Sequence, residues 1–192
     1  DRFNWYQLGA ALTHPEVSKV FDLSQDINKT IGIEDASVLV QPCNGYGDAS
    51  MIRKLIDQQK PDAIFIFTDP RYWTWLFEIE REIRSKIPIF WLNIWDDYPA
   101  PKYNEQYYDS VDLLMAISKQ TKNINEIVLG EKAKNKVIEY VPHGIDDKVF
   151  HPITPEHTNY EEFINFKKSL LKNKEKEFVV FFNSRNIHRK RP

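Results

Sequence analysis

Cysteine is nearly absent from the sequence: Cys43 is the only one among 192 residues. A single cysteine excludes an intrachain disulfide and a cysteine-ligated metal cluster. It also fits a reducing compartment, so we expect a cytoplasmic protein. The five histidines show no pair at metal-ligand spacing, and no Asp-x-Asp follows a predicted strand. The sequence therefore predicts no metal site.

A long apolar run and an excess of charge of one sign are also missing. No run approaches the roughly 18 apolar residues of a membrane-spanning helix, so no transmembrane segment is expected. The formal net charge of -2 gives no overall attraction to nucleic acid or to a membrane surface. The sequence begins at Asp1 without a methionine or an apolar signal segment and stops at Pro192, just after a predicted strand. We expect it to be a fragment of a longer protein.

Apolar runs that alternate with amphipathic segments make up most of the sequence. Strands are predicted over 17–23, 36–40, 63–68, 88–94, 111–117 and 137–141, and helices over 3–12, 49–59, 73–86 and 119–129. Asp48 and Ser118 are the expected N-caps of two of these helices. The run 63–68 is almost continuously apolar, as in a strand buried on both faces of a parallel sheet. This alternation predicts an α/β fold with a Rossmann-like, doubly wound parallel sheet.

The stretch 137–152 leads from this first domain into a second one. It is predicted as a short buried strand that ends at Pro142, followed by a tight turn at His143-Gly144 in which glycine permits a positive φ. The apolar residues Ile145, Val149 and Phe150 are expected to hold the exit path in place. We therefore place the first domain at 1–152.

The segment 153–192 is predicted to be a hinge and the truncated start of a second Rossmann-like domain. A helix is expected over 158–171 and a strand over 177–182. Four cations occupy seven positions after that strand, at 185–191. They fit a solvated charged turn or a diphosphate clamp, in which Arg185 forks onto phosphate oxygens and Lys190 adds a point charge. No aromatic residue is interleaved for base stacking, so a nucleic-acid partner is not expected.

Ligands of open α/β sheets bind beyond the carboxyl ends of the strands, which selects the residues after each predicted strand. Asp96 or Asp97 would act as a base or as an orienting group for a substrate hydroxyl, or their loop would only cap the next helix. Asp69 has the same two interpretations, and the following proline favours a turn. His143 is either structural or part of an anion site, since Gly144 leaves backbone amides accessible.

The segment Tyr-Val-Pro-His-Gly-Ile-Asp-x-x-Val-Phe-x-Pro, at 140–152, resembles the interdomain segment of GT-B-fold glycosyltransferases of the retaining family 4 type, the glycosyl transferases group 1. In that family a helix and a strand follow, and then an Arg-x-x-x-x-Lys pair, which Arg185 and Lys190 match. The segment Leu-Met-Ala-Ile-Ser-Lys, at 114–119, is similar to the family's strand-then-serine element. The resemblance covers about 36–192.

The resemblance implies a hexosyltransferase-type enzyme that moves a sugar from a nucleotide diphosphate sugar to a hydroxyl of a glycan or other acceptor. Transfer would occur with retention, without a metal and without a further cofactor. The first domain would bind the acceptor and the second the donor. Arg185 and Lys190 would neutralise the donor diphosphate, with His143 and Gly144 lining the cleft, and Asp96 would complete the catalytic set. The fragment alone is expected to be inactive.

The sequence departs from the family pattern at the acceptor side. The family often has His-Asp after the strand at 88–94, where this chain has Trp95-Asp96. A tryptophan cannot relay a proton, although a sugar could stack on its ring. Trp95, Asp96, Asp97 and Asp69 are therefore the acceptor-side candidates. A non-catalytic GT-B-like binding module and a GT-B sugar-nucleotide epimerase are the alternative functions.

Overall fold

The computed structural model describes residues 3–11, 13, 15–17, 19–172, 174 and 180. The chain divides into two compact units, Asp1–His143 and Gly144–Pro192. This division falls earlier along the chain than the boundary predicted after residue 152. Apart from residue 180, the predicted strand at 177–182 lies outside the described residues.

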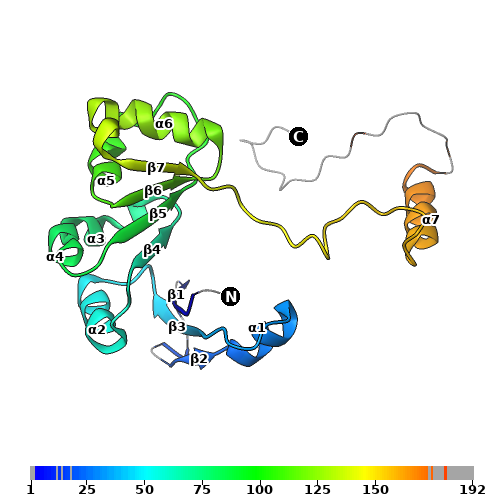
Figure 1. Ribbon diagram of the computed structural model, residues 1–192, viewed down its shortest axis with the longest axis horizontal. Coiled ribbons are helices and arrows are strands. Elements are labelled where there is room, and N and C mark those ends of the chain that lie inside the picture. The colour runs from blue at the N-terminus through cyan, green and yellow to red at the C-terminus, as the bar shows by residue number, and fades with distance from the viewer. Residues whose placement is uncertain are drawn as a thin grey trace. The chain divides into compact units, whose positions relative to one another are not determined.

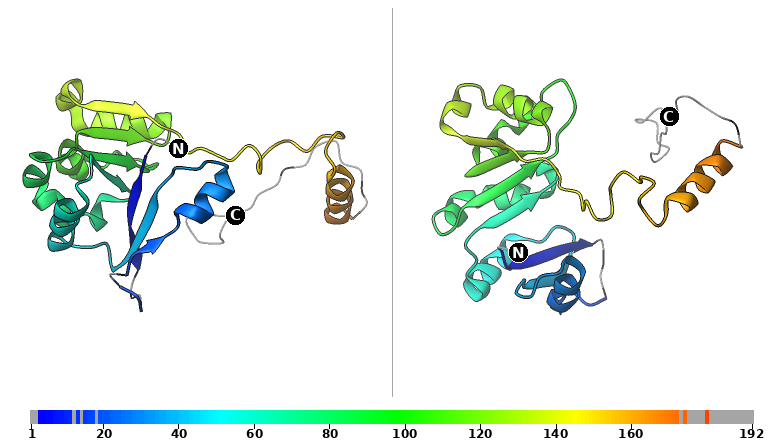
Figure 2. Two further views of the ribbon diagram at one scale, coloured as in Figure 1. Left: turned by 60° about the horizontal axis from the view of Figure 1, so that its bottom comes forward. Right: turned by 45° about the vertical axis from the view of Figure 1, so that its right-hand side comes forward.

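The first unit contains two β-sheets. In one sheet, β1 (Trp5–Ala11) runs parallel to β3 (Val38–Asn44), and the short β2 (Phe21–Asp22) pairs antiparallel with the other side of β3. Figure 2 shows β1 alongside β3. The other sheet is entirely parallel, in the order β4 (Ile64–Phe67), β5 (Ile89–Asn93), β6 (Leu113–Ala116) and β7 (Val137–Tyr140).

Helices connect these strands, and together they confirm the predicted Rossmann-like α/β fold (Figure 1). The α-helices are α1 (Ser24–Ile31), α2 (Ala49–Gln59), α3 (Thr74–Glu78), α4 (Glu80–Arg84), α5 (Glu105–Asp109), α6 (Lys119–Leu129) and α7 (Tyr160–Leu170). Short 3-10 helices are η1 (Pro70–Tyr72), η2 (Lys102–Asn104) and η3 (Gly130–Asn135). Within the described part of the chain, none of the helices has the length and apolar character needed to cross a membrane.

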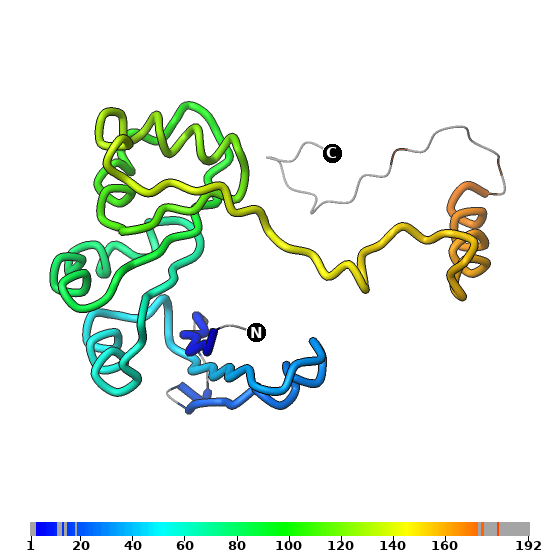
Figure 3. Tube along the Cα trace, in the orientation of Figure 1, coloured from blue at the N-terminus to red at the C-terminus, as the bar shows by residue number. Residues whose placement is uncertain are grey.

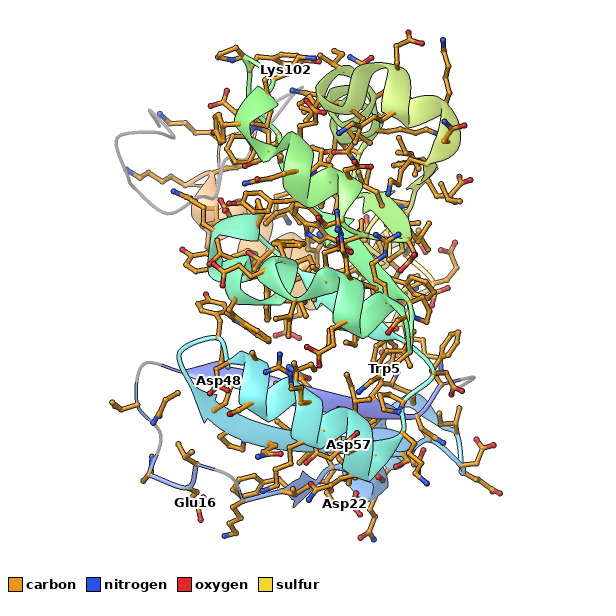
Figure 4. The ribbon with its side chains drawn as sticks, turned by 90° about the vertical axis from the view of Figure 1, so that its left-hand side faces the viewer. Trp5, Glu16, Asp22, Asp48, Asp57 and Lys102 are labelled. Carbon is orange, nitrogen blue, oxygen red and sulfur yellow. The ribbon has the colours of Figure 1, made fainter. Side chains whose placement is uncertain are left out.

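Side-chain caps fix the starts of α2 and α6, as the sequence predicts. Asp48 Oδ1 accepts hydrogen bonds from the backbone amides of Ser50 at 2.7 Å and Met51 at 2.9 Å. The side-chain hydrogen bond from Ser50 is the main cause that lowers the pKa of Asp48. Figure 4 shows Asp48 at the beginning of α2 and Asp57 towards its other end. Ser118 Oγ accepts from the amide of Thr121 at 3.0 Å.

The core lies between one face of the parallel sheet and the helices that connect its strands. Ile66, Trp91, Leu114 and Ile138 are in register across the four strands and all point to this face. The ring of Trp91 is fully buried, with centroids 5.8 Å from Phe77 and 5.2 Å from Tyr108. Residues of α2 to α6 contribute to the core, among them Ile52, Ile56, Leu76, Phe77, Ile83, Tyr108, Ile124, Val128 and Leu129.

The opposite face of the parallel sheet corrects two predictions. Phe65 and Phe67 are 43% and 44% exposed, so β4 alternates and is not buried on both faces. Val137 is 56% exposed, and Ile138 is the only buried residue of β7. Both strands are sheet edges, and the helix-covered core contacts them on one face. A continuous apolar run therefore did not identify a strand covered on both sides.

The helix predicted over 3–12 is wrong, because this segment forms β1. Seven residues of β1 pair with β3, from Trp5 opposite Val38 to Ala11 opposite Asn44. Pairing with a distant strand overrides the local apolar period, since local propensity is a weak guide. The strand predicted over 17–23 is reduced to Phe21–Asp22, and α1 was not predicted.

The segment after β7 also differs from its prediction. Residues 141–146 form no turn, and Gly144 is not among the glycines with a positive φ. The turn comes later, where the amide of Phe150 donates to Asp146 O at 2.7 Å and the amide of Lys148 donates to Asp146 Oδ1 at 2.9 Å. Ile145 and Val149 are exposed, as is Phe150, and do not hold the exit path by burial. The helix predicted over 158–171 is confirmed as α7.

Because the core covers only one face of the sheet, we expect alanine substitutions at two neighbouring leucines of β6 to lower the free energy of unfolding by very different amounts. Leu114 is fully buried, so Leu114→Ala should lower the free energy of unfolding by about 2–5 kcal/mol. Leu113 is only half-buried on the opposite face, and Leu113→Ala should cost clearly less. Urea unfolding of both variants measures the difference. Equal losses would contradict the one-sided core.

Candidate functional site

Two loops of the parallel sheet meet at its carboxyl edge. β4 and β5 are neighbouring parallel strands, and Phe67 near the end of β4 pairs with Leu92 near the end of β5. The residues that follow, Asp69 in one loop and Trp95, Asp96 and Asp97 in the other, therefore leave the sheet side by side. The trace in Figure 3 shows how this part of the chain returns repeatedly to the same sheet. The loops that carry the four acceptor-side candidates predicted from the sequence thus follow neighbouring strands at the same edge of the sheet.

The loop after β4 holds a strained backbone position. Thr68 has a φ of 99°, which β-branched residues rarely adopt. Such a conformation costs about 1–3 kcal/mol and persists only when the surroundings fix it. The indole Nε1 of Trp91 donates to Thr68 O at 3.0 Å, which ties this strained residue to the core.

Asp69 is engaged by Arg71, two residues further on. Its Oδ1 accepts from the backbone amide of Arg71 and from Nε at 2.9 Å each, and its Oδ2 accepts from Nη2 at 2.8 Å. Burial opposes ionisation of this carboxyl, but the hydrogen bonds and charge of Arg71 outweigh it and lower the pKa of Asp69. Asp69 thus forms the turn that Pro70 suggested and also anchors an arginine at the edge.

The loop after β5 is held by hydrogen bonds at almost every residue. The amide of Trp95 donates to Asn93 Oδ1 at 3.1 Å, and the Trp95 indole donates to Asp97 O at 3.0 Å. Gln120 of α6 donates from Nε2 to Asp96 O at 2.9 Å. The loop backbone is therefore fixed by β5 on one side and by α6 on the other.

Asp96 and Asp97 differ in what their carboxylates do. Asp97 Oδ1 accepts from the backbone amide of Tyr98 at 2.8 Å, so it is used in shaping the loop. The carboxylate of Asp96 is exposed and makes no hydrogen bond or ion pair with the described residues. Of the two candidates that the sequence left open, Asp96 is the one with both carboxylate oxygens free of hydrogen bonds to the described residues.

A buried polar cluster beneath this loop was not predicted. Asn93 at the end of β5 donates from Nδ2 to Oδ1 of Asn125 in α6 at 2.6 Å, and both residues are almost fully buried. The side chains of Asn104 and Tyr108 are buried nearby. Burial raises the pKa of Tyr108, and the amides of Asn93 and Asn104 offset part of this rise. A polar residue that ends an apolar run, as Asn93 does, was the available sequence signal.

The predicted donor-side residues are not assembled in the described structure. Arg185 and Lys190 lie outside the described residues. His143 ends the first unit and Gly144 begins the second, so no site that combines them is described. The His143 ring contacts Phe67, with centroids 5.9 Å apart. Within the described residues, no three His, Cys, Asp or Glu side chains come together as a metal site requires.

Comparisons with protein-family models, with curated proteins and with solved structures found no match to this chain.

The pairing of Asp69 with Arg71 can be tested by titration. Ionised Asp69 stabilises the folded chain above its usual pKa of about 3.9, and this contribution is lost as the pH falls through the lower folded-state pKa. Arg71→Ala should raise the pKa of Asp69, because burial is then opposed mainly by the backbone amide at position 71. NMR titration of the carboxyl carbon measures the change.

A matched control is Arg53→Ala, which removes another arginine–carboxylate pair, to Glu82 on α4, and should leave the pKa of Asp69 as it was. An unchanged pKa in Arg71→Ala would show that Arg71 does not hold the carboxylate.

The buried amide pair should stabilise both the fold and the loop. Asn125→Leu leaves the Nδ2 group of Asn93 without its acceptor, at a cost of about 1–3 kcal/mol. Hydrogen exchange at the amides of 95–98 should also become faster. Glu126→Leu, on the exposed side of α6, is the control and should change stability by no more than about 0.5 kcal/mol. Equal behaviour of the two variants would refute the role of the buried pair.

Proposed function

We propose that this chain is the acceptor-side part of a GT-B-type glycosyltransferase. The complete enzyme would transfer a sugar from a nucleotide diphosphate sugar to a hydroxyl of its acceptor, with retention and without a metal. The observation that carries the proposal is the carboxyl edge of the parallel sheet, where the carboxylate of Asp96, which has no partner among the described residues, follows Trp95. This is the position at which the family resemblance places the acceptor.

Asp96 would orient the acceptor hydroxyl. A carboxylate that accepts a hydrogen bond from the hydroxyl holds its oxygen towards the anomeric carbon and stabilises the proton as it leaves. The rigid loop supports this role, because Gln120 and Asn93 fix the backbone on both sides of the carboxylate. The loop then needs little reorganisation when the acceptor binds.

Arg185 and Lys190 would act on the donor. As the bond from the anomeric carbon to the diphosphate oxygen breaks, negative charge grows on the leaving group. Two fixed cations stabilise that charge more in the transition state than in the bound donor, which raises the rate. Both assignments rest on the spacing Arg-x-x-x-x-Lys and on its place after a predicted strand.

Trp95 would pack against the acceptor sugar and would not transfer a proton. Its ring is half-buried and makes an edge contact with Tyr103, with centroids 6.2 Å apart. The indole Nε1 is already donating to Asp97 O, so the ring plane is held in place. An aromatic ring held in a fixed plane can pack against the apolar face of a sugar.

We also propose a cytoplasmic location, since Cys43 is the only cysteine and is free and buried.

Nucleotide release by the complete protein tests the proposal. Incubated with nucleotide diphosphate sugars and an acceptor mixture, it should release nucleoside diphosphate, and Asp96→Asn should reduce turnover by about 10²–10⁴-fold while donor binding persists. Asp57→Asn, on the exposed surface of α2, is the matched control and should be fully active. Donor binding without turnover in the unaltered protein would favour a non-catalytic module, and epimerised donor without acceptor an epimerase.

A further inference from the structure

Four exposed tyrosines lie in the segments that follow strands β3, β4 and β5. Tyr46 follows β3, Tyr72 ends η1 after β4, and Tyr98 and Tyr103 belong to the segment after β5. Their exposed fractions are 36%, 43%, 49% and 69%, in that order. We call them, together with Trp95, the aromatic strip. None of its members was identified from the sequence except Trp95.

The backbone builds one end of the strip. Tyr46 lies between Gly45 and Gly47, whose φ values of 59° and 80° belong to the left-handed region that favours glycine. The chain therefore turns sharply on both sides of Tyr46. Its ring stacks on Tyr72 with centroids 4.3 Å apart and makes an edge contact with Trp73 at 5.6 Å. The stacked pair joins the loop after β3 to the loop after β4.

Arg71 precedes Tyr72 in the loop after β4, and its side chain pairs with Asp69. The pKa of Arg71 is raised chiefly by its hydrogen bonds and charge interaction with Asp69, and the phenol groups of Tyr72 and Tyr103 contribute further. Tyr103 in turn contacts Trp95. The strip thus contains two ring contacts, Tyr46–Tyr72 between the loops after β3 and β4 and Trp95–Tyr103 after β5, and the loops after β4 and β5 follow neighbouring parallel strands.

The chemistry of the strip distinguishes between ligand classes. Its exposed rings belong to tyrosines, which have an apolar face and a polar end. The loops 68–73 and 95–104 contain no exposed Leu, Ile or Phe beside them. A lipid chain would need such aliphatic or phenyl surface. The loops 68–73 and 95–104 carry three carboxylates and two cations. Arg71 is paired with Asp69, and carboxylates outnumber cations in these loops, which disfavours a phosphate backbone.

We infer that the aromatic strip binds an extended carbohydrate, so that the acceptor of the proposed transfer is a glycan chain. Pyranose rings present C–H groups that pack on the electron-rich faces of aromatic rings. Their hydroxyls donate to carboxylates, which fix orientation. The stacked Tyr46–Tyr72 pair binds a sugar unit remote from Asp96, and Trp95 binds the unit that reacts. This inference rests on the proposed function and names its acceptor class.

Glycan binding by the complete protein tests the inference. A glycan array that covers hexose, hexosamine and uronic acid chains should identify a bound oligosaccharide, whose affinity is then measured by calorimetry. Tyr46→Ala and Tyr72→Ala should each weaken binding by about tenfold or more. Tyr46→Phe keeps the ring and should stay within about threefold of the unaltered protein. Phe65→Ala removes an exposed ring from the open sheet face and should leave the affinity unchanged.

Donor binding, measured in the same samples by thermal shift with nucleotide diphosphate sugars, separates the two proposals. Weaker glycan binding with intact donor binding in Tyr72→Ala supports the strip. If the unaltered protein binds the donor but no glycan, the proposed glycan binding by the strip is wrong, and the proposed transferase function is unaffected. If the unaltered protein binds neither the donor nor a glycan, both proposals are wrong. Binding of single-stranded dT20 that requires Tyr72, with no glycan bound, would assign the strip to nucleic acid instead.

Discussion

The hydrogen bond between Asn93 and Asn125 connects the fold of this protein to its candidate site. Asn93 is the last residue of β5, in the middle of the parallel sheet, and Asn125 lies on the buried side of α6. In a core from which water is excluded, removing the acceptor of a buried N–H group costs more than the bond itself gains. The same Asn93 side chain accepts from the amide of Trp95. The direction in which the chain leaves β5 is therefore set inside the core.

This internal restraint allows a surface loop to be rigid. Loops that carry function are usually mobile unless a scaffold positions them. Here side chains hydrogen-bond to the backbone of both loops: Trp91 donates to Thr68, Asn93 accepts from Trp95, and Gln120 donates to Asp96. Asp96 can then present its carboxylate while its backbone stays fixed. Catalytic groups and binding planes require this kind of pre-organisation.

Part of this arrangement could be predicted from the sequence, and the reasons are local. The caps at Asp48 and Ser118 act on amides two or three residues away, so their spacing alone identified the starts of α2 and α6. The carboxyl edge could also be predicted, because it depends only on the order of strands. The sequence could not show which of Asp96 and Asp97 has a carboxylate free of hydrogen bonds to the described residues, because this depends on which side chain accepts a hydrogen bond from the following backbone amide.

Other features depend on contacts that the sequence does not encode locally. β1 was mistaken for a helix because its pairing with β3 involves residues more than 30 positions away. The exposed faces of Phe65 and Phe67 depend on which side the helices pack, which an apolar run does not reveal. The strip around Tyr46 and Tyr72 joins loops from two different sheets, so no single motif contains it. Arg185 and Lys190 remain predictions.

Mapping where an acceptor glycan binds tests the proposed acceptor site most directly. Amide and indole NMR signals of the labelled protein can be followed during titration with the bound oligosaccharide. A glycan bound at the carboxyl edge should shift the indole Nε1–H of Trp95 and the amides of 68, 69, 71, 72 and 95–98. Shifts concentrated around Ser85, Ser110 and Lys136, near the opposite ends of the strands, with none at Trp95, would contradict it.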